Sequence, residues 1–264
     1  MIAPNEAYYE GGRVTVSGSS TVMPLAEMDA EEFNMLQKAY YVTITSGGTG
    51  VGITDIGEGR SEIAMASREI KPSERMFYEI GGKQIHEFIV GYDAICIVVS
   101  PEIYESGIAS LTREQLKDIY SGKISNWKDV DGPDSDIFVI GRRAGSGTRD
   151  IFNEIIMGSK EAETPGVSME AGDSSEVKTA IKGSNNAIGY IGYSYVQSGD
   201  MNLVALEGVN PTIEAIRNGA YPLARKLYFY TLGIPKPGAR AFIDFVLCNE
   251  GQKIAIENGF IPIG

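Results

Sequence analysis

Hydrophobic residues recur along the chain in two alternating patterns. Runs of β-branched and aromatic residues with strand-like spacing fall at 13–17, 41–46, 62–67, 88–99, 137–141, 187–191, 202–206 and 227–232. Between most of these runs, apolar residues repeat at the spacing of one helix face. Alternating strands and helices predict an α/β architecture with mostly parallel sheets.

Helix-start and helix-stop signals bound several of the predicted helices. Thr112, with Gln115 three residues later, has the pattern of a capping box. The apolar repeat after Thr148 stops at Gly158, which is the residue type favoured just beyond a helix end. We also expect one last helix over about 239–257.

Two segments, 88–93 and 221–225, are candidates for connections between lobes. Each one directly precedes an apolar strand, and the two segments lie far apart in the sequence. If the chain leaves a first lobe near residue 92 and returns near 228, its last helix completes that first lobe. We therefore predict two lobes joined by two hinge crossings. Lobe I comprises 1–92 and 229–264, and lobe II comprises 93–228.

Three predicted strands run into a Gly/Ser/Thr-rich turn that opens a helix. These strand–turn segments are 14–21, 42–50 and 137–148. Each turn presents helix-start N–H groups, hydroxyl donors and glycines that let a ligand approach the backbone. One such turn is usually only a helix cap. Three of them, with Arg142 and Arg143 beside the last, predict a cage for a small, multiply charged oxyanion.

Composition narrows the possible partners. The 264 residues carry a formal net charge of −12, with a sequence pI near 4.7. This balance argues against nucleic acid as the main partner, because phosphate backbones recruit basic surfaces. It does not exclude a small anion, since a closed cleft lined with dipoles and one or two arginines sets its own local potential.

The residues that most often carry chemistry are scarce. Cys96 and Cys248 both lie in apolar runs, and we expect two buried apolar residues rather than a disulfide. His86 is the only histidine, so a multi-histidine metal site is excluded. Ser146 lies between glycines but lacks the Gly-x-Ser-x-Gly spacing of a nucleophile elbow. Trp127 is expected to fix a loop rather than to stack on a ligand.

Membrane and export signals are weak. No stretch approaches the ~20 apolar residues of a membrane-spanning helix. Residues 1–6 lack the basic flank and apolar region of a signal peptide. These observations leave two expectations open, a cytoplasmic protein or a mature segment whose leader has been removed.

Taken in order, several segments resemble the phosphate-binding proteins of bacterial and archaeal ABC transporters. They are 18–26, 47–52, 64–68 and 142–149, supported by 111–127, 187–192 and 259–262. The resemblance covers nearly the whole chain. It implies a two-lobed type II periplasmic-binding-protein fold with a ligand cleft between the lobes, and a protein that delivers phosphate to a membrane permease without altering it chemically.

The same resemblance implies a set of phosphate ligands. Thr21 would donate its N–H and hydroxyl, Thr49 stands where the family usually has a serine, and Arg142 matches the family's phosphate-binding arginine. The full implied site is Ser20, Thr21, Val22, Thr49, Ser67, Arg68, Arg142, Ser146, Gly147 and Thr148. Charge-assisted arginine contacts and neutral N–H or O–H donors are what a desolvated oxyanion requires.

Two positions depart from some members of that family. Arg68 stands where those members have an aspartate that accepts a proton from phosphate, and Ala144 stands where they have an aspartate that restrains the binding arginine. The site is therefore expected to be more positive and to favour dianionic phosphate. Two interpretations of Arg68 stay open, a solvated surface pair or a ligand contact. Tyr190 either lines the cleft or packs against a helix.

The resemblance also implies partners and location. It implies no cofactor, metal or catalytic residue, and a monomer that binds inorganic phosphate and the transmembrane permease subunits of an ABC transporter. It implies an extracytoplasmic site, in the periplasm or at the cell surface, where a lipid anchor is one means of attachment. The alternatives are a binding protein for sulfate or another tetrahedral oxyanion, and an enzyme acting on a phosphorylated small molecule. The enzyme is disfavoured because no carboxylate pair or cysteine falls inside the three turns.

Overall fold

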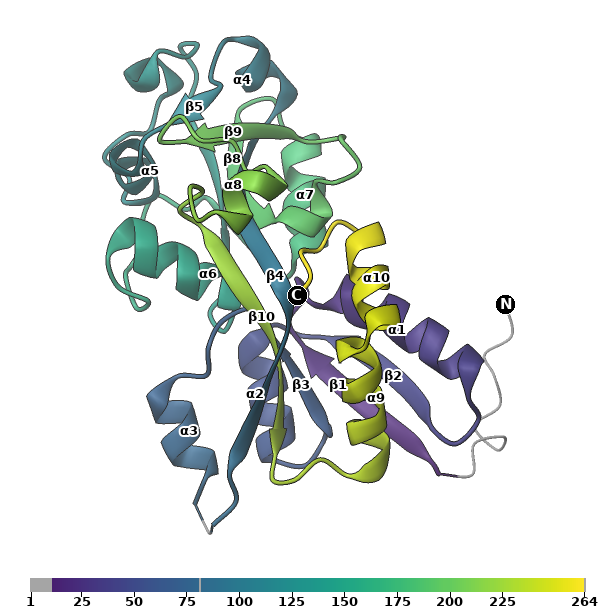
Figure 1. Ribbon diagram of the computed structural model, residues 1–264. Helices are drawn as coiled ribbons and strands as arrows, with labels where there is room; N and C mark the ends of the chain where they lie inside the picture. The colour runs from purple at the N-terminus through teal and green to yellow at the C-terminus, as the bar shows by residue number, and fades with distance from the viewer. Residues whose placement is uncertain (1–10, 81, 264) are drawn as a thin grey trace. The chain divides into compact units, whose positions relative to one another are not determined.

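The computed structural model describes residues 11–80 and 82–263 (Figure 1). Its contacts divide the chain into two compact units. Unit 1 contains the described chain up to Tyr92 and from Lys226 onward, and unit 2 is Asp93–Arg225. The chain thus passes between the units twice, after Tyr92 and after Arg225. The crossings expected from the sequence are at 92/93 and 228/229.

Unit 1 is a sheet with helices on both faces. Its strands lie in the order β2-β1-β3-β10-β4, with β1 parallel to β2 and β3 and with β10 antiparallel to β3. The strands are β1 (Arg13–Gly18), β2 (Tyr41–Ser46), β3 (Ile63–Ala66), the first part of β4 (Ile85–Val99) and most of β10 (Ala224–Leu232). The helices are α1 (Met23–Leu36), α2 (Thr49–Gly57), α3 (Pro72–Tyr78), α9 (Pro237–Leu247) and α10 (Asn249–Glu257).

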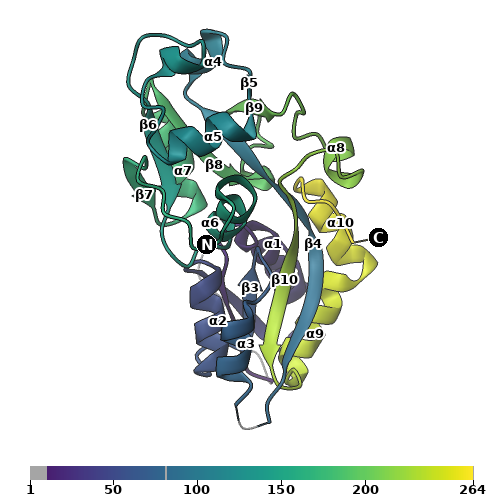
Figure 2. The ribbon, with the colours of Figure 1, turned by 90° about the vertical axis from the view of Figure 1, so that its left-hand side faces the viewer.

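Alternation along the strands of unit 1 builds two cores. In β3, Ile63 and Met65 join the core formed with α1, α9 and α10, while Ala64 and Ala66 join the core formed with α2. Successive side chains of a strand point to opposite faces, so a fully apolar strand needs cover on both sides. Figure 2 shows α2 and α9 on opposite sides of this sheet. The small side chains of β3 let α2 pack close to the strand.

Unit 2 has the same kind of architecture. Its strands run in the order β4-β8-β6-β7, with β9 paired to β4 and β5 paired to β9. The further strands are β5 (Ser110–Leu111), β6 (Phe138–Arg142), β7 (Met169–Ala171), β8 (Ala187–Gly192) and β9 (Asn202–Leu206). The helices are α4 (Pro101–Glu105), α5 (Arg113–Tyr120), α6 (Gly147–Phe152), α7 (Ser174–Lys182) and α8 (Ile213–Arg217), with short turns η2 (Trp127–Val130), η3 (Asn153–Met157) and η4 (Tyr193–Tyr195).

Most of the predicted elements are confirmed. All of the predicted strands are present, and β6 is parallel to both of its neighbours β7 and β8. The capping box forms as predicted, with Thr112 Oγ1 accepting from Gln115 N at 3.0 Å. After α6 the chain continues as one π-helical turn and stops at Gly158, whose φ is 94°. The indole N–H of buried Trp127 donates to Asn186 O at 2.9 Å, so this residue fixes a loop.

Three expectations were wrong or incomplete. The last helix is two helices, because Cys248 between α9 and α10 is extended, with a ψ of 170°. Gly251 lets α10 turn back closely, since a Cβ there would lie 2.4 Å from Phe245 O. Cys96 is buried as predicted, but Cys248 is exposed at this junction, and both thiols are free. The short strands β5 and β7 were missed because two or three residues carry no periodicity.

No helix within 11–80 or 82–263 combines the length and the apolar character that crossing a membrane requires.

Asp29 is a buried carboxylate on the apolar face of α1. It is fully buried beside Leu25, Ala26 and Phe33, its neighbours at helical spacing. Neither of its oxygens has a hydrogen-bond partner among the described residues. Burial raises the pKa of Asp29 to about 8, because removal from water penalises the charged form. The folded protein therefore holds a proton on Asp29 that an unfolded chain releases at lower pH.

Asp29 should make stability fall as pH rises. Because its folded pKa lies above the ordinary 3.8, folding takes up a proton between these values, and each pH unit costs up to about 1.4 kcal/mol. We expect the free energy of unfolding, measured with urea from pH 4 to 8.5, to decline more steeply for wild type than for Asp29→Asn. Glu31→Gln, on an exposed position of the same helix, should keep the wild-type slope. Parallel curves for wild type and Asp29→Asn would contradict this account.

Candidate functional site

Two of the predicted turns lie side by side in unit 1. β1 and β2 are parallel neighbours that end together, with Gly18 opposite Ser46. The carbonyl of Gly18 accepts from Gly47 N at 2.9 Å and from Gly48 N at 2.8 Å. Gly18 has a φ of 131°, and a Cβ there would lie 2.4 Å from Met65 O. Only glycine fits this junction, which brings the starts of α1 and α2 to the end of β3.

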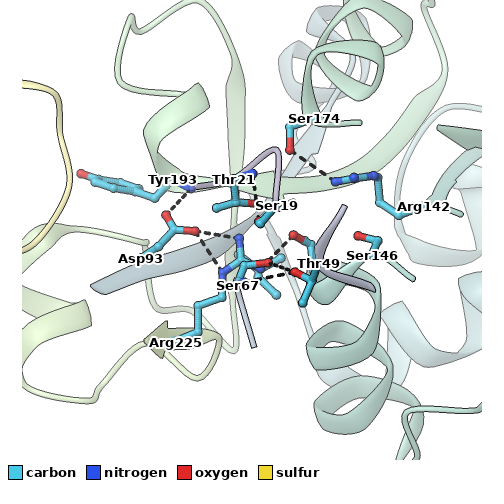
Figure 3. A network of polar contacts seen from close by, with 12 residues as sticks. Ser19, Thr21, Thr49, Ser67, Asp93, Arg142, Ser146, Ser174, Tyr193 and Arg225 are labelled. Carbon is cyan, nitrogen blue, oxygen red and sulfur yellow. Dashed lines mark hydrogen bonds and ion pairs between the residues drawn. The ribbon is translucent and has the colours of Figure 1, made fainter. Parts of the chain in front are cut away.

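The hydroxyls at these turns accept hydrogen bonds from backbone N–H groups (Figure 3). Ser19 Oγ accepts from Thr21 N at 3.2 Å, and Thr49 Oγ1 accepts from Ser67 N at 3.2 Å. The hydroxyls of Thr49 and Ser67 are 3.4 Å apart. All four residues are buried. A hydroxyl oxygen that accepts from the backbone does not use its own hydrogen in that bond. In the Thr49–Ser67 contact, one of the two hydroxyls donates its hydrogen to the other.

The remaining predicted residues of the first turn differ in role. Ser20 is buried at the turn, next to Thr21. The N–H of Val22 donates to Ser19 O at 3.1 Å and therefore helps to close the turn. Within residues 11–80 and 82–263, no side chain caps the first residue of α1 or α2. Uncapped helix starts are suited to an anion, because their N–H groups and the helix dipole favour negative charge.

Arg68 forms a buried ion pair with Glu74, within unit 1. Its Nη1 and Nη2 donate to the two oxygens of Glu74, each at 2.8 Å, and Nη1 also donates to Glu69 O at 2.9 Å. The Arg68 side chain is 1% exposed. Of the two interpretations of Arg68, the solvated surface pair was therefore wrong, because the pair with Glu74 buries the Arg68 side chain. The guanidinium is held in a fork by a carboxylate, which compensates the added charge that the sequence analysis assigned to the site.

The charge of Arg68 acts on Glu74 in turn. Burial by itself raises the pKa of Glu74, but the hydrogen bond and the charge of Arg68 outweigh it and lower this pKa overall. Glu74 also accepts from Lys71 N at 2.8 Å and so caps the start of α3. The pair thus connects the end of β3 to the next helix.

In unit 2, Arg142 ends β6 with its side chain buried. Its Nη1 donates to Ser174 Oγ at 3.3 Å, and its Nη2 donates to Gly172 O at 3.2 Å. Burial lowers the pKa of Arg142, and the charge of Arg225 lowers it further while Tyr190 opposes the shift. An arginine side chain nevertheless stays charged in proteins. Arg142 is therefore a fixed cation in a desolvated position.

Tyr190 packs behind this arginine. Its hydroxyl accepts from Arg142 N at 3.3 Å, and its ring stacks on Phe152 with the centroids 4.1 Å apart. The ring of Tyr120 packs against the rings of both Phe152 and Tyr190. Of the two interpretations left open for Tyr190, packing is the one observed within unit 2.

The predicted Ser146–Gly147–Thr148 turn begins α6. Ser146 is the N-cap, and its Oγ accepts from Arg149 N at 3.3 Å. Thr148 Oγ1 accepts from Arg225 Nη1 at 2.8 Å. Gly145, with a φ of 86°, forms the turn between the strand and the helix. As in unit 1, the hydroxyl oxygens accept bonds from fixed donors.

Sequence reasoning missed the partners that hold these groups. Asp93, Arg225 and Ser174 were assigned no role, yet Arg225 binds both Asp93 and Thr148, and Ser174 binds Arg142. Burial raises the pKa of Asp93, while the charge of Arg225 opposes this rise. A signal was present in the sequence, since the two predicted crossing segments each end in a charged residue, and the two charges are opposite.

Comparison with known proteins places this geometry in a family. Residues 5–250 match the model of the PBP superfamily domain. PstS, a phosphate-binding protein of Staphylococcus epidermidis, is 31% identical over 95% of this chain and 78% of its own length. The chain belongs to the PstS family of phosphate-binding proteins. PstS of Borreliella burgdorferi is also 31% identical, over 95% of this chain and 90% of its own.

A solved structure supports the same assignment. A protein of Clostridium perfringens, described as a phosphate ABC transporter substrate-binding protein with bound phosphate, is 34% identical to this PstS-family chain. It superposes with a TM-score of 0.86 over 96% of this chain and 100% of its own. The predicted family and the two-lobed periplasmic-binding-protein fold are thereby confirmed.

Loss of the Glu74 carboxylate should destabilise the protein. Glu74→Gln leaves the buried Arg68 without its counter-charge, and breaking a buried pair typically costs about 3–5 kcal/mol. Because Glu74 is itself 21% exposed, we expect the lower end of that range in urea unfolding at pH 7. The pKa of Glu74 is lowered on folding, so the difference between wild type and variant should shrink as pH falls below the ordinary glutamate range.

The double variant Arg68→Met/Glu74→Gln is the matched control for this prediction. Removing both charges should recover much of the lost stability, because no uncompensated charge stays buried. A double variant that is less stable than Glu74→Gln would contradict the assigned pairing.

Proposed function

We propose that this chain binds inorganic phosphate and delivers it to the transmembrane permease of an ABC transporter, as an extracytoplasmic solute-binding protein. The observation that carries the proposal is that hydroxyl oxygens at the predicted turns accept hydrogen bonds from the backbone. At the three predicted turns, side-chain oxygens accept from fixed N–H groups, and these bonds do not use the hydrogens of the hydroxyls. A fully ionised tetrahedral anion offers only acceptors and matches such a set.

The proposed ligands follow the predicted site. Backbone and hydroxyl donors come from the turns, and Arg142 supplies the positive charge in a desolvated place. Family membership supports this assignment, because the similar PstS proteins are named for phosphate binding and the similar Clostridium perfringens structure contains phosphate. The proposed set is Ser20, Thr21, Val22, Thr49, Ser67, Ser146, Gly147, Thr148 and Arg142. Arg68 is left out of this set, because its described side-chain contacts are with the Glu74 carboxylate and the Glu69 carbonyl.

We further propose that the two units are the two lobes of the binding protein and share one phosphate. The donors of the first two turns belong to unit 1, whereas Arg142 and the third turn belong to unit 2. A ligand that takes donors from both units is removed from water when they close on it. Each hydrogen bond to the anion then gains strength from the lower local dielectric.

A binding role accounts for these groups better than catalysis. The hydroxyl oxygens of Ser19, Thr49 and Ser146 accept from backbone N–H groups, and none of the hydrogen bonds described for these three hydroxyls is to a carboxylate or histidine base. A nucleophilic hydroxyl needs such a base. We therefore propose a monomeric binding protein without a cofactor. Sulfate is the nearest alternative ligand, because the donors described suit any tetrahedral oxyanion.

Calorimetry with a panel of anions tests this function. After unfolding and refolding to strip bound ligand, we expect the protein to bind one phosphate per chain, and arsenate more weakly or equally because it shares the geometry and charge. Sulfate should bind the same donors less tightly than phosphate, because its oxygens are less basic and accept weaker hydrogen bonds. A sugar phosphate should not bind, since desolvation on all sides leaves no place for an ester. Tight binding of the sugar phosphate, or of sulfate alone, would refute the proposal.

Arg142→Ala should weaken phosphate binding more than any other single change. Loss of one partner leaves the ligand's charge buried and under-compensated, which costs about 2–5 kcal/mol, or roughly 30-fold or more in affinity. Arg142→Lys should restore part of the loss, because a point charge remains but the planar fork does not. Both are measured by titration with phosphate at constant ionic strength.

The neighbouring Arg143 provides the control, since it has the same charge but is exposed. Arg143→Ala should bind phosphate nearly as wild type does. Thr49→Val, in unit 1, should weaken the same single site if both units share one ligand. An Arg142→Ala protein that binds within twofold of wild type would exclude Arg142 from the site.

A further inference from the structure

The two places where the chain passes between the units carry opposite charges. Asp93 is the first residue of unit 2 after the first crossing, and Arg225 is its last residue before the second. Within unit 2, Arg225 Nη2 donates to Asp93 Oδ2 at 2.7 Å, and Arg225 Nε donates to the same oxygen at 3.0 Å. The two side chains are only 2% and 1% exposed. A buried ion pair therefore joins β4 to β10 where the two strands enter unit 2.

Each partner has a further contact that helps to fix its orientation, and Figure 3 shows the one between Asp93 and Tyr193. Asp93 Oδ1 accepts from Tyr193 N at 2.9 Å, so the carboxylate is also held by the turn after β8. Arg225 Nη1 donates to Thr148 Oγ1 at 2.8 Å. The plane of the guanidinium is set by Asp93, and its Nη1 is directed at Thr148, in the third predicted turn.

The direction of this last bond has a chemical consequence. A guanidinium has five N–H donors and no acceptor, so the Thr148 oxygen must accept from it. A hydroxyl has a single hydrogen, which therefore points away from Arg225 and towards an acceptor. Arg225 thereby decides which side of Thr148 acts as a donor. A ligand oxygen that meets this hydrogen accepts it, and an unprotonated, charged oxygen is the strongest such acceptor.

The charge of Arg225 also acts on Arg142, which is the proposed anion-binding arginine. Its charge contributes to lowering the pKa of Arg142, so the two cations act on one region of unit 2. The carboxylate of Asp93 lies on the far edge of the Arg225 guanidinium from Thr148, because the Nε and Nη2 edge faces Asp93 and Nη1 faces Thr148. The pair therefore compensates one charge while leaving the donor edge directed at Thr148.

We propose that Arg225, held by Asp93, is a positioning residue that orients the Thr148 hydroxyl to donate to an unprotonated oxygen of bound phosphate. The proposal rests on the proposed function, because it takes phosphate as the ligand at Thr148. Arg225 acts through the hydroxyl of Thr148, and Asp93 acts through Arg225. This chain of contacts connects the ligand site of unit 2 to both points at which the chain crosses between the units.

A double-mutant cycle on phosphate affinity tests this dependence. Arg225→Lys keeps the positive charge but cannot hold Asp93 and Thr148 in one fixed plane, and Thr148→Val removes the hydroxyl. We expect each single variant to bind phosphate about tenfold more weakly. The double variant should bind no more weakly than Thr148→Val, because Arg225→Lys keeps the positive charge and changes only how the Thr148 hydroxyl is held. Thr148→Ser should retain near-wild-type affinity and the full sensitivity to Arg225→Lys.

The controls separate this inference from the proposed function. Arg217→Lys, on an exposed position of α8, should bind as wild type does. If Arg225→Lys does not fold, as judged by its thermal melt, Asp93→Asn takes its place in the cycle with the same expected non-additivity. Suppose that the wild type binds phosphate and that the affinity losses of Arg225→Lys and Thr148→Val add in the double variant. This result would overturn the positioning role of Arg225 alone. Wild type that does not bind phosphate would overturn the proposed function and this inference together.

Discussion

A buried anion site has to be built from donors, and each donor has to be fixed without giving up its hydrogen. This constraint accounts for the recurrent arrangement at the turns. Ser19, Thr49 and Ser146 all accept from a backbone N–H, and Thr148 accepts from an arginine. Each of these bonds holds the oxygen through a lone pair and does not use its hydrogen. Such preorganisation limits the entropy lost on binding.

Three buried arginines show how the surroundings of a charge decide its role. Arg68 and Arg225 are each held by a carboxylate, Glu74 and Asp93. In contrast, the contacts described for the Arg142 guanidinium are a hydroxyl and a carbonyl. A cation already compensated by a carboxylate adds little attraction for an anion, but it can orient its neighbours. A desolvated cation that hydrogen-bonds to neutral groups keeps more of its attraction for an anion than one that is paired with a carboxylate.

The backbone supplies the second condition for such a site. In unit 1 the parallel pairing of β1 with both β2 and β3 brings their ends together, and parallel strands of an open sheet place the following helix starts along one edge. Gly18 permits the close approach to Met65 that this convergence requires. In unit 2 the single strand β6 leads into α6, and its arginine is supported from behind by Tyr190. Local turn chemistry and strand order therefore act together.

Local order in the sequence determined much of this protein. Strand positions, the capping box at Thr112, the stop at Gly158 and the three turns follow from periodicity and from the conformational preferences of glycine, serine and threonine, which act within a few residues. The ordered match of several motifs also determined the family. These signals say which groups a turn presents, because helix starts and hydroxyls have a fixed chemistry.

Only the tertiary structure decided what each charged group faces. Glu74 lies six residues from Arg68, whereas Asp93 and Arg225 are 132 positions apart, and no local rule pairs them. The break at Cys248 and the exposure of its thiol likewise depend on how closely α10 packs on α9. A sequence lists charges and donors in order. Their pairing, burial and direction arise when distant segments exclude water between them, so they belong to the folded chain alone.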